Sequence, residues 1–345
     1  MRLLLILVGS IIVLSSCNNK PKSVDGFMVI KGKTMGTKYE IAYKSNIDCK
    51  NEIDSLLNNY ISLLSLYDSS SILFKFNHNI VLNSREYNKL HTHKTYFVEL
   101  DSISNRLFLE SGGAFNPGLG ELYNYWGVGE KNTFPSNFDT AQIERIKKLS
   151  WGFKLDFQNH LAIKANSEQK LNFNSLAIGQ IVDVIAKRFD STYHLKNYYI
   201  NIGGKIRVKG NNGHDSYWPI IVEKPMINSL KQIEFCTLPL KNYSLATANN
   251  LKDFHFSQGK RYSQYIDPIS GYPSNNELLS ATILAPSAIE ANAYASTCMV
   301  LGLSKAIAFV QKNPSLKAFL IFEKDGKMTY WSNSNLAYTL AKKTE

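Results

Sequence analysis

Residues 285–302 read APSAIEANAYASTCMVLG, and this stretch decides how the rest of the chain is interpreted. It begins with a helix-start signature, because Ser287 can cap the first turn and Glu290, three residues on, can reach back to the cap's own N–H. Most residues that follow are small or apolar, with two polar side chains, Asn292 and Ser296, on one face. These two lie four residues apart, so they share one face of the predicted helix.

A helix with so little charge is expected to be buried. Buried Asn and Ser side chains are satisfied either by hydrogen bonds inside the core or by a ligand. The flanking small residues Ala291, Ala293 and Ala295 let another backbone segment or a ligand approach closely. Both interpretations stay open on this stretch alone.

The composition predicts a globular protein with a substantial core. The chain has 345 residues, of which 44% are hydrophobic and 19% are charged. Its net charge is +11, but the basic residues are scattered, which argues against a dedicated nucleic-acid tract and favours a basic surface. The four cysteines form no CxxC pair, so a thiolate zinc site is not expected. They are Cys17, Cys49, Cys236 and Cys298.

The N-terminus is typical of a targeting segment. Residues 1–16 form a predicted signal peptide whose apolar part, 3–14, is too short for an ordinary membrane-spanning helix. The small residues before Cys17 resemble a bacterial lipobox, in which Cys17 becomes the lipid-bearing first residue. Residues 17–25 would then be a lipidated tether, and the protein a membrane-anchored lipoprotein facing the periplasm or the cell exterior. A plain secretory signal is the alternative.

We interpret residues 26–345 as one α+β domain. Strands are expected at 26–32 and 37–43, a helix at 176–189 capped by Asn174 or Ser175, and a buried strand at 278–284. Residues 114–129, AFNPGLGELYNYWGVG, are rich in Gly and aromatic side chains. They predict either a loop that contacts a ligand or a loop that packs its aromatic rings into the core.

Seven segments, taken in chain order, resemble the motifs of the ApbE family, the FAD:protein FMN transferases. They are Met35-Gly36-Thr37, Tyr67 to Asn77, Gly113 to Pro117 with Trp126-Gly127, Ser175 to Asp183, Asn201 to Gly204, Tyr262 to Gly271, and the helix at 285–302. Each motif is weak by itself, and the ordered set covers nearly the whole mature chain.

The resemblance implies a single ApbE-type, T-fold-like domain of mixed sheets with packed helices. It implies transfer of FMN from FAD, as substrate, to a Thr or Ser hydroxyl of an exported or membrane-bound flavoprotein, with release of AMP. Mg²⁺ on the diphosphate is the implied cofactor, because phosphoryl transfer depends mainly on positioning and charge stabilisation.

The resemblance also implies site residues in three roles. The residues expected to contact FAD are Met35, Tyr67, Ala114, Phe115, Asn116, Ile178 and Gln264. The expected magnesium ligands are Ser175, Asn292 and Ser296, and the expected catalytic residues are Gln264 and Asp267. Asp183 matches the family residue and could orient the magnesium ligands without contacting the ion itself.

Several of these positions depart from the family pattern. Asn292 replaces an Asp and so removes a negative charge beside a dication. Gln264 replaces a His and cannot take a proton at neutral pH. Ile178 replaces a Lys, Gln180 a Tyr and Asn116 an Asp. The departures keep other interpretations open: a catalytically impaired lipoprotein that stores or delivers FAD, an FAD-hydrolysing activity, or a scaffold without flavin.

Overall fold

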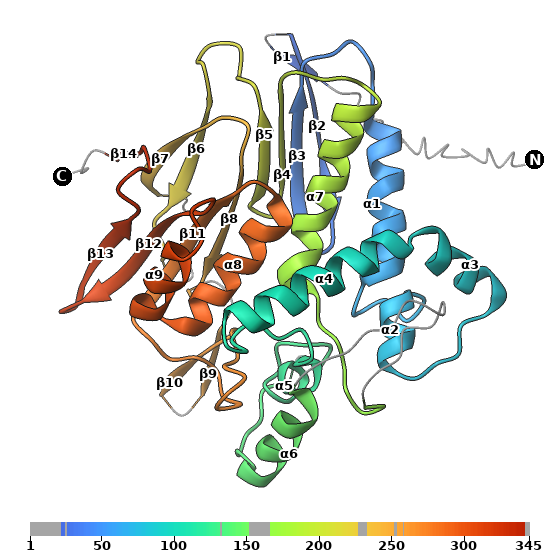
Figure 1. The fold of residues 1–345 in the computed structure, drawn as a ribbon, viewed down its shortest axis with the longest axis vertical. Coiled ribbons are helices and arrows are strands. Elements are labelled where there is room, and N and C mark those ends of the chain that lie inside the picture. Colours follow the sequence, from blue (N-terminus) through green and yellow to red (C-terminus); the bar gives the residue numbers. More distant parts are fainter. Residues whose placement is uncertain are drawn as a thin grey trace, which may run out of the picture.

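A computed structural model describes residues 22–24, 26–131, 133–151, 166–226, 233–251, 254–257 and 259–341. Its centre is a nine-stranded sheet in the order β1-β2-β3-β4-β5-β8-β11-β12-β13, in which every neighbouring pair is antiparallel (Figure 1). These strands are β1 (Lys22–Val24), β2 (Phe27–Thr34), β3 (Thr37–Tyr43), β4 (Tyr198–Ile202), β5 (Lys205–Lys209), β8 (Ser244–Asn249), β11 (Leu278–Ala285), β12 (Lys317–Lys324) and β13 (Lys327–Ser332).

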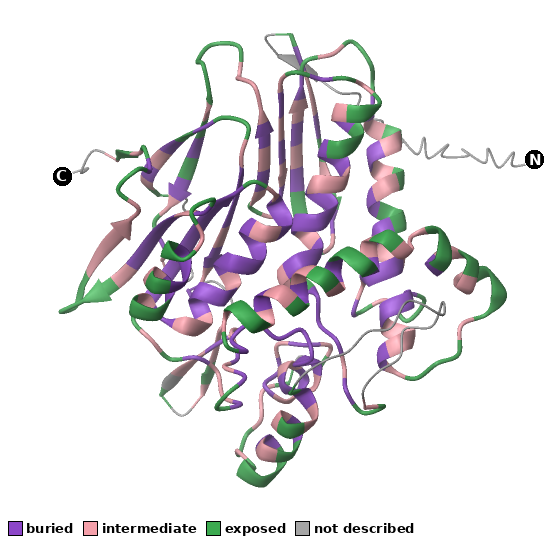
Figure 2. Ribbon diagram, viewed as in Figure 1, coloured by how far each residue is buried: buried purple, intermediate pink, exposed green. Residues whose placement is uncertain are grey.

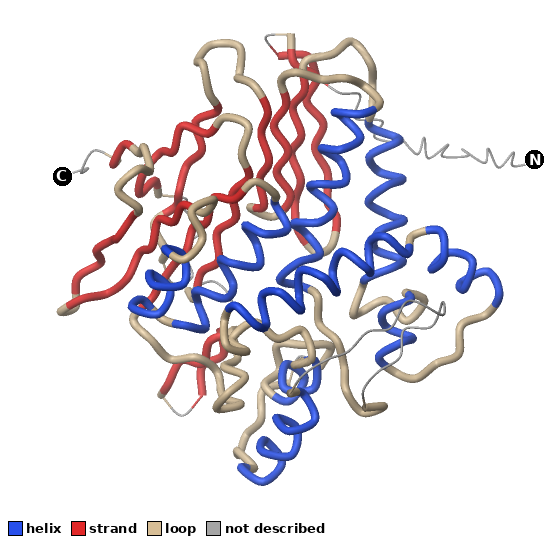
Figure 3. Tube along the Cα trace, viewed as in Figure 1, coloured by secondary structure: helices blue, strands red, loops and turns tan. Residues whose placement is uncertain are grey.

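Helices cover one face of this sheet, as Figure 3 shows. α7 (Asn174–Ser191) packs on β4 and β5, and α8 (Ala288–Leu301) packs on β5, β8 and β11. The other helices are α1 (Lys50–Leu64), α2 (Ile72–Asn77), α3 (Ser84–Thr92), α4 (Lys94–Glu110), α5 (Gly120–Tyr125), α6 (Thr140–Ser150) and α9 (Leu303–Gln311).

A small sheet in the order β14-β7-β6 packs on the opposite face. Its strands are β6 (Trp218–Glu223), β7 (Glu234–Leu240) and β14 (Thr339–Leu340), and a separate hairpin joins β9 (Phe254–Ser257) to β10 (Lys260–Ser263). Successive residues of β11 point to opposite faces of the sheet. Ile283 packs in the core beneath the helices, and Leu284 packs in the core beneath the small sheet. This explains why all eight β11 residues are buried (Figure 2).

The structure confirms the predicted α+β class, the mixed sheets with packed helices, and most of the expected elements. The helix expected at 176–189 begins earlier, at Asn174, so the prediction that Asn174 or Ser175 caps it is wrong. Phe173 is the N-cap, and the side chain of Asn172 accepts a hydrogen bond from the Asn174 N–H at 2.9 Å instead.

The predicted signal peptide, 1–16, and residues 17–21 and 25 of the predicted tether lie outside the described residues. Within that tether, Lys22–Val24 form β1 and pair with β2, so backbone hydrogen bonding begins before residue 26. In the described part of the chain, no helix is long and apolar enough to cross a membrane.

Candidate functional site

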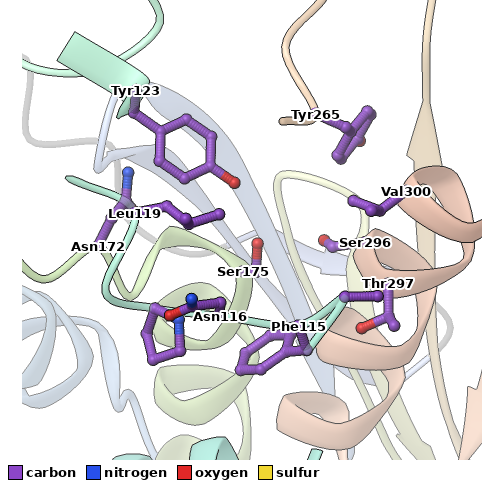
Figure 4. Close-up of a pocket in the computed structure, with 12 residues that line it drawn as sticks. Phe115, Asn116, Leu119, Tyr123, Asn172, Ser175, Tyr265, Ser296, Thr297 and Val300 are labelled. Carbon is purple, nitrogen blue, oxygen red and sulfur yellow. The ribbon is translucent and has the colours of Figure 1, made fainter. Parts of the chain in front are cut away.

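A cavity lies where the beginning of α7 faces the second half of α8 (Figure 4). The hydroxyl oxygens of Ser175, Ser296 and Tyr123 are turned toward its interior. Those three side chains come from α7, α8 and α5, which are far apart in sequence. The remaining lining residues are Ala114, Phe115, Asn116, Pro117, Leu119, Asn172, Tyr265, Thr297 and Val300.

A close approach of α7 and α8 creates this arrangement. A Cβ atom on Gly179 would lie 2.4 Å from the backbone carbonyl oxygen of Ala288, so only glycine fits there. Gly179 follows Ser175 by one turn, whereas Ala288 precedes Ser296 by two turns. The two helices are therefore antiparallel at this contact, and the start of α7 is brought beside the later turns of α8.

Asp183 holds the first turn of α8. Its two carboxylate oxygens accept hydrogen bonds from the N–H groups of Ala288 at 3.0 Å and Ile289 at 2.9 Å. Arg207 lies 3.1 Å from the same carboxylate and also donates to the Pro286 carbonyl at 2.8 Å. Burial raises the pKa of Asp183 to about 6, although the two N–H groups and Arg207 act to lower it. Asp183 thus positions the helix on which Asn292 and Ser296 lie.

The helix start predicted at Ser287 is confirmed. Ser287 is the N-cap of α8, and its side chain accepts a hydrogen bond from the Glu290 N–H at 3.4 Å. The carboxylate of Glu290 accepts from the Ser287 hydroxyl at 2.9 Å and pairs with Arg106 of α4 at 2.6 Å. The polar groups of this turn are therefore engaged in holding α8 in place.

Asn292 behaves differently from the polar groups at the start of its helix. It is only 4% exposed, and its Nδ2 has no hydrogen-bond partner among the described residues. Thr297, equally deep in α8, donates its hydroxyl proton to the Ala293 carbonyl at 2.8 Å. Hydrogen bonding within the core therefore explains the Thr297 hydroxyl but does not explain the Asn292 amide nitrogen. The unpaired nitrogen favours the interpretation that Asn292 contacts a ligand.

The amide of Asn116 explains one departure from the family pattern. Its Nδ2 donates to the Ser150 carbonyl at 3.0 Å, and its Oδ1 accepts from the Gly118 N–H at 2.8 Å. A carboxylate has no proton to donate to Ser150 at neutral pH. The local structure therefore accommodates the amide. Asn116, Ala114 and Phe115 line the cavity, and their contacts with FAD stay predictions.

Gln180 takes part in a buried network instead of lining the cavity. The Tyr60 hydroxyl donates to its Oε1 at 2.6 Å, and its Nε2 donates to the Tyr96 carbonyl at 3.0 Å and to Glu99 at 2.7 Å. Because both the oxygen and the nitrogen of the Gln180 amide are hydrogen-bonded, the structure accommodates a Gln where the family has a Tyr.

Four predicted FAD contacts are not among the residues that line the cavity: Met35, Tyr67, Ile178 and Gln264. Met35 occupies the tight turn between β2 and β3, where it and Gly36 have positive φ angles of 48° and 73°. Ile178 is partly buried against the main core, and Tyr67 is 65% exposed. Their contacts with FAD stay predictions.

The two predicted catalytic residues lie on the segment that connects β10 to β11. Asp267 holds a turn there, because its carboxylate accepts from the N–H groups of Ile269 at 3.0 Å and Ser270 at 3.3 Å. Gln264 is partly exposed and directly precedes Tyr265, which lines the cavity. The catalytic role of both residues stays a prediction.

The predicted site residues did not include seven of the residues that line the cavity: Pro117, Leu119, Tyr123, Asn172, Tyr265, Thr297 and Val300. Val300 follows Ser296 by one helical turn, so helical spacing would have found it. Tyr123 belongs to the stretch 114–129. Leu119 and Tyr123 line the cavity and also belong to the apolar cluster that contains Trp126, so core packing is confirmed for this stretch and contact with a ligand stays a prediction. Burial raises the pKa of Tyr123 to about 12, so its hydroxyl is a neutral donor at physiological pH.

The predicted magnesium ligands offer only neutral oxygen atoms. Ser175 and Ser296 line the cavity, and Asn292 precedes Ser296 by one turn on the same helix. Across the residues described, no group of three or more His, Cys, Asp or Glu side chains could hold a metal ion. Mg²⁺ takes oxygen ligands and is commonly held by few protein groups together with substrate phosphates, so this donor set fits a cation that arrives on a phosphate.

Comparison with known proteins identifies the fold and the family. The ApbE family model matches residues 35–320. The chain is 29% identical to the FAD:protein FMN transferase of Haemophilus influenzae, over 96% of this chain and 95% of the relative. It is 30% identical to the FAD:protein FMN transferase of Vibrio cholerae, over 97% of this chain and 98% of the relative.

Solved structures agree with these sequence relationships. The flavin transferase ApbE from Vibrio cholerae superposes with a TM-score of 0.74 at 27% identity, covering 89% of this chain and 97% of that chain. The apo form of the Pseudomonas stutzeri flavinyl transferase ApbE has a TM-score of 0.75 at 24% identity, covering 89% and 95%, and so shares the fold. Because the family model spans most of the chain and relatives align over nearly its full length, this protein belongs to the ApbE family.

Proposed function

We propose that this protein transfers FMN from FAD to a Thr or Ser hydroxyl of a flavoprotein and releases AMP. The observation that carries the proposal is the cavity between α7 and α8, which has Ser175 and Ser296 on facing walls and Asn292 one turn before Ser296. The motif resemblance implies that these residues are the family's site residues, and the similar proteins of Haemophilus influenzae and Vibrio cholerae are FAD:protein FMN transferases.

The proposed reaction forms one bond and breaks another at the phosphorus atom of FMN. The acceptor hydroxyl oxygen bonds to that phosphorus, the anhydride bond of FAD breaks, and AMP leaves with the bridging oxygen. The hydroxyl proton passes to water, since the Gln264 amide does not accept a proton at neutral pH. Gln264 would orient the hydroxyl, and positioning of this kind is the main demand of phosphoryl transfer.

The other residues would bind and orient the substrate. Ser175, Asn292 and Ser296 would hold Mg²⁺, which supplies charge neutralisation for the diphosphate when it is bound. Ala114, Phe115 and Asn116 would contact FAD from the cavity wall, and Met35, Tyr67 and Ile178 from outside it. Asp267 would act by holding the turn that presents Gln264 and Tyr265.

The test is a transfer assay with the purified mature protein. FAD, MgCl₂ and an acceptor domain with a Thr in an acidic-Gly-hydrophobic context are expected to give covalent flavin on the acceptor and one AMP per flavin. An acceptor with Thr→Val and a reaction in EDTA serve as controls. Absence of covalent flavin, under conditions where the Vibrio cholerae relative modifies the same acceptor, would contradict the proposal.

The relatives favour the transferase over a catalytically impaired FAD-binding protein, the alternative that the side chains at Asn292, Ile178 and Gln264 leave open. That protein would retain FAD intact and release no AMP. The Asn292→Asp and Gln264→His double variant would then raise the transfer rate above that of the wild type. FMN and AMP formed without an acceptor would instead indicate FAD hydrolysis, with water in place of the hydroxyl.

We also propose that the protein is anchored to a membrane through lipid on Cys17, facing the periplasm or the cell exterior, where its acceptor flavoprotein would be exported or membrane-bound. The support is the apolar segment 3–14 followed by small residues and Cys17. Metabolic labelling with a radioactive fatty acid tests this proposal. Label is expected on the wild type and absent from Cys17→Ala, and an unlabelled wild type would contradict it.

A further inference from the structure

We infer that this site binds its divalent cation only together with the diphosphate of the dinucleotide, and that Asn292 sets this order of binding. The inference rests on the proposed function, because it concerns the same cavity and the same substrate. It adds a property of this chain: the protein without substrate has almost no affinity for the cation.

The first argument comes from charge. As far as the described chain shows, no Asp, Glu, His or Cys lines the cavity. The carboxylates at the start of α8 are already engaged, Asp183 by two backbone N–H groups and Arg207, and Glu290 by Arg106 and Ser287. Neutral oxygens alone replace the water shell of Mg²⁺ poorly, because this ion gives up water reluctantly. The missing negative charge must come from the phosphates.

The second argument comes from the amide of Asn292. A buried amide offers an oxygen, which suits a cation, and an N–H donor, which suits an anion. The Nδ2 atom has no partner in the described protein, and a buried donor without a partner destabilises the free state. A carboxylate here would bind the bare cation and would have no donor for a phosphate oxygen. Asn292 is therefore matched to a cation and a phosphate arriving together.

Thermodynamic linkage makes the inference quantitative. If FAD raises the affinity of the site for the cation by some factor, the cation raises the affinity for FAD by the same factor. In the wild type, FAD should raise the affinity for the cation, and the cation should raise the affinity for FAD, by the same large factor. A variant with a carboxylate at residue 292 should bind the cation without FAD.

The experiment measures Mn²⁺ binding by the electron paramagnetic resonance signal of the free ion. Wild type, Asn292→Asp and Asn250→Asp are each titrated alone, with FAD, and with FMN plus AMP, which carry the same groups without a diphosphate. Asn250 is the matched control, because it is also a 4% exposed Asn with one amide atom, Oδ1, that no described residue pairs, and it directly follows β8 instead of lying one turn before Ser296 on α8.

We expect wild type and Asn250→Asp to bind Mn²⁺ at least about tenfold more tightly with FAD than alone, and FMN plus AMP to have no effect. Asn292→Asp should bind Mn²⁺ alone at least about tenfold more tightly than wild type. Tight Mn²⁺ binding by the wild type without FAD would overturn the inference. So would an Asn292→Asp variant whose Mn²⁺ affinity equals that of Asn250→Asp.

Ser296→Asp covers the case in which Asn292→Asp does not fold. Ser296 is only partly buried and faces the cavity, so a carboxylate there remains solvated. It should also bind Mn²⁺ without FAD, and an unchanged affinity would count against the inference. FAD binding without metal, followed by flavin fluorescence, reports on the proposed function separately, because a protein that binds no FAD fails that function whatever its metal affinity.

Discussion

The first turn of α8 and the turns that follow it use polar residues for opposite purposes. At its start, Asp183, Ser287 and Glu290 are fully engaged with backbone N–H groups, hydroxyls or arginines. Further along, Asn292 has an amide nitrogen without a partner among the described residues, and Ser296 faces a cavity. The paired groups of the first turn position the helix, and Asn292 and Ser296 are left available for a ligand. Substitutions among the paired groups should therefore change stability, and those at Asn292 and Ser296 should change binding.

Gly179→Ala should have the largest effect. The added Cβ would lie 2.4 Å from the Ala288 backbone oxygen, and a helix backbone cannot move aside as a flexible side chain can. We expect a loss of about 3 kcal/mol in the free energy of unfolding, measured by urea denaturation. Gly326→Ala is the control for glycine replacement, because a Cβ atom there would meet no described atom within 4 Å, although its φ of 69° carries some strain. Equal losses in the two variants would show that α7 and α8 do not need this close contact.

Asp183→Asn should have the second-largest effect on the free energy of unfolding. An amide can accept only one of the two N–H groups of Ala288 and Ile289 well, and it loses the charge that faces Arg207. The expected loss of stability is about 2 kcal/mol, with weaker FAD binding as a consequence. Asp190→Asn, on the same helix, removes a more exposed pair with Lys209 and should cost less than about 1 kcal/mol. A larger loss for Asp190→Asn would reverse the assignment of Asp183 as the anchor.

Ser296→Ala should separate binding from stability. The hydroxyl faces the cavity, so its removal is expected to change the free energy of unfolding by no more than about 0.5 kcal/mol. Affinity for FAD in the presence of Mg²⁺ should fall roughly tenfold, as is usual for one lost contact to a charged ligand. Thr297→Ser is the control for a substitution at the next residue along the cavity lining, because it keeps the hydroxyl that donates to the Ala293 carbonyl. A Ser296→Ala variant that unfolds easily yet binds FAD normally would contradict the comparison.

The smallest effect concerns Cys298, which lies in the same half of α8 as Ser296. It is fully buried, and burial raises the pKa of its thiol to about 12. Cys49 and Cys236 are also buried and free. We expect no reaction of these three thiols with a disulfide reagent at pH 8 in the folded protein, and full reaction in denaturant. Fast modification of Cys298 would mean that the ligand cavity extends to the packed face of α8.

The regular elements could be predicted because their signals are local. The strands at 37–43 and 278–284 have uninterrupted apolar or alternating patterns, and the start of α8 at Ser287 follows from capping chemistry. The start of α7 was predicted wrongly, since Asn172, outside the helix, bonds the N–H of Asn174. Tyr123 could not be singled out among the aromatic residues of 114–129, because whether a ring enters the core or the cavity depends on α5 packing against distant segments.

By itself, the sequence determined the α+β class, the order of the elements, the ApbE motifs and the neutral side chains at positions 116, 264 and 292, because each depends on residue type and short-range spacing. Only the tertiary structure decided which polar groups are paired. The amides of Asn116 and Gln180 are bonded at both ends, and that of Asn292 keeps a nitrogen that no described residue pairs. The physical reason is that hydrogen-bond satisfaction in a core depends on partners far away in sequence, and only folding brings them within reach.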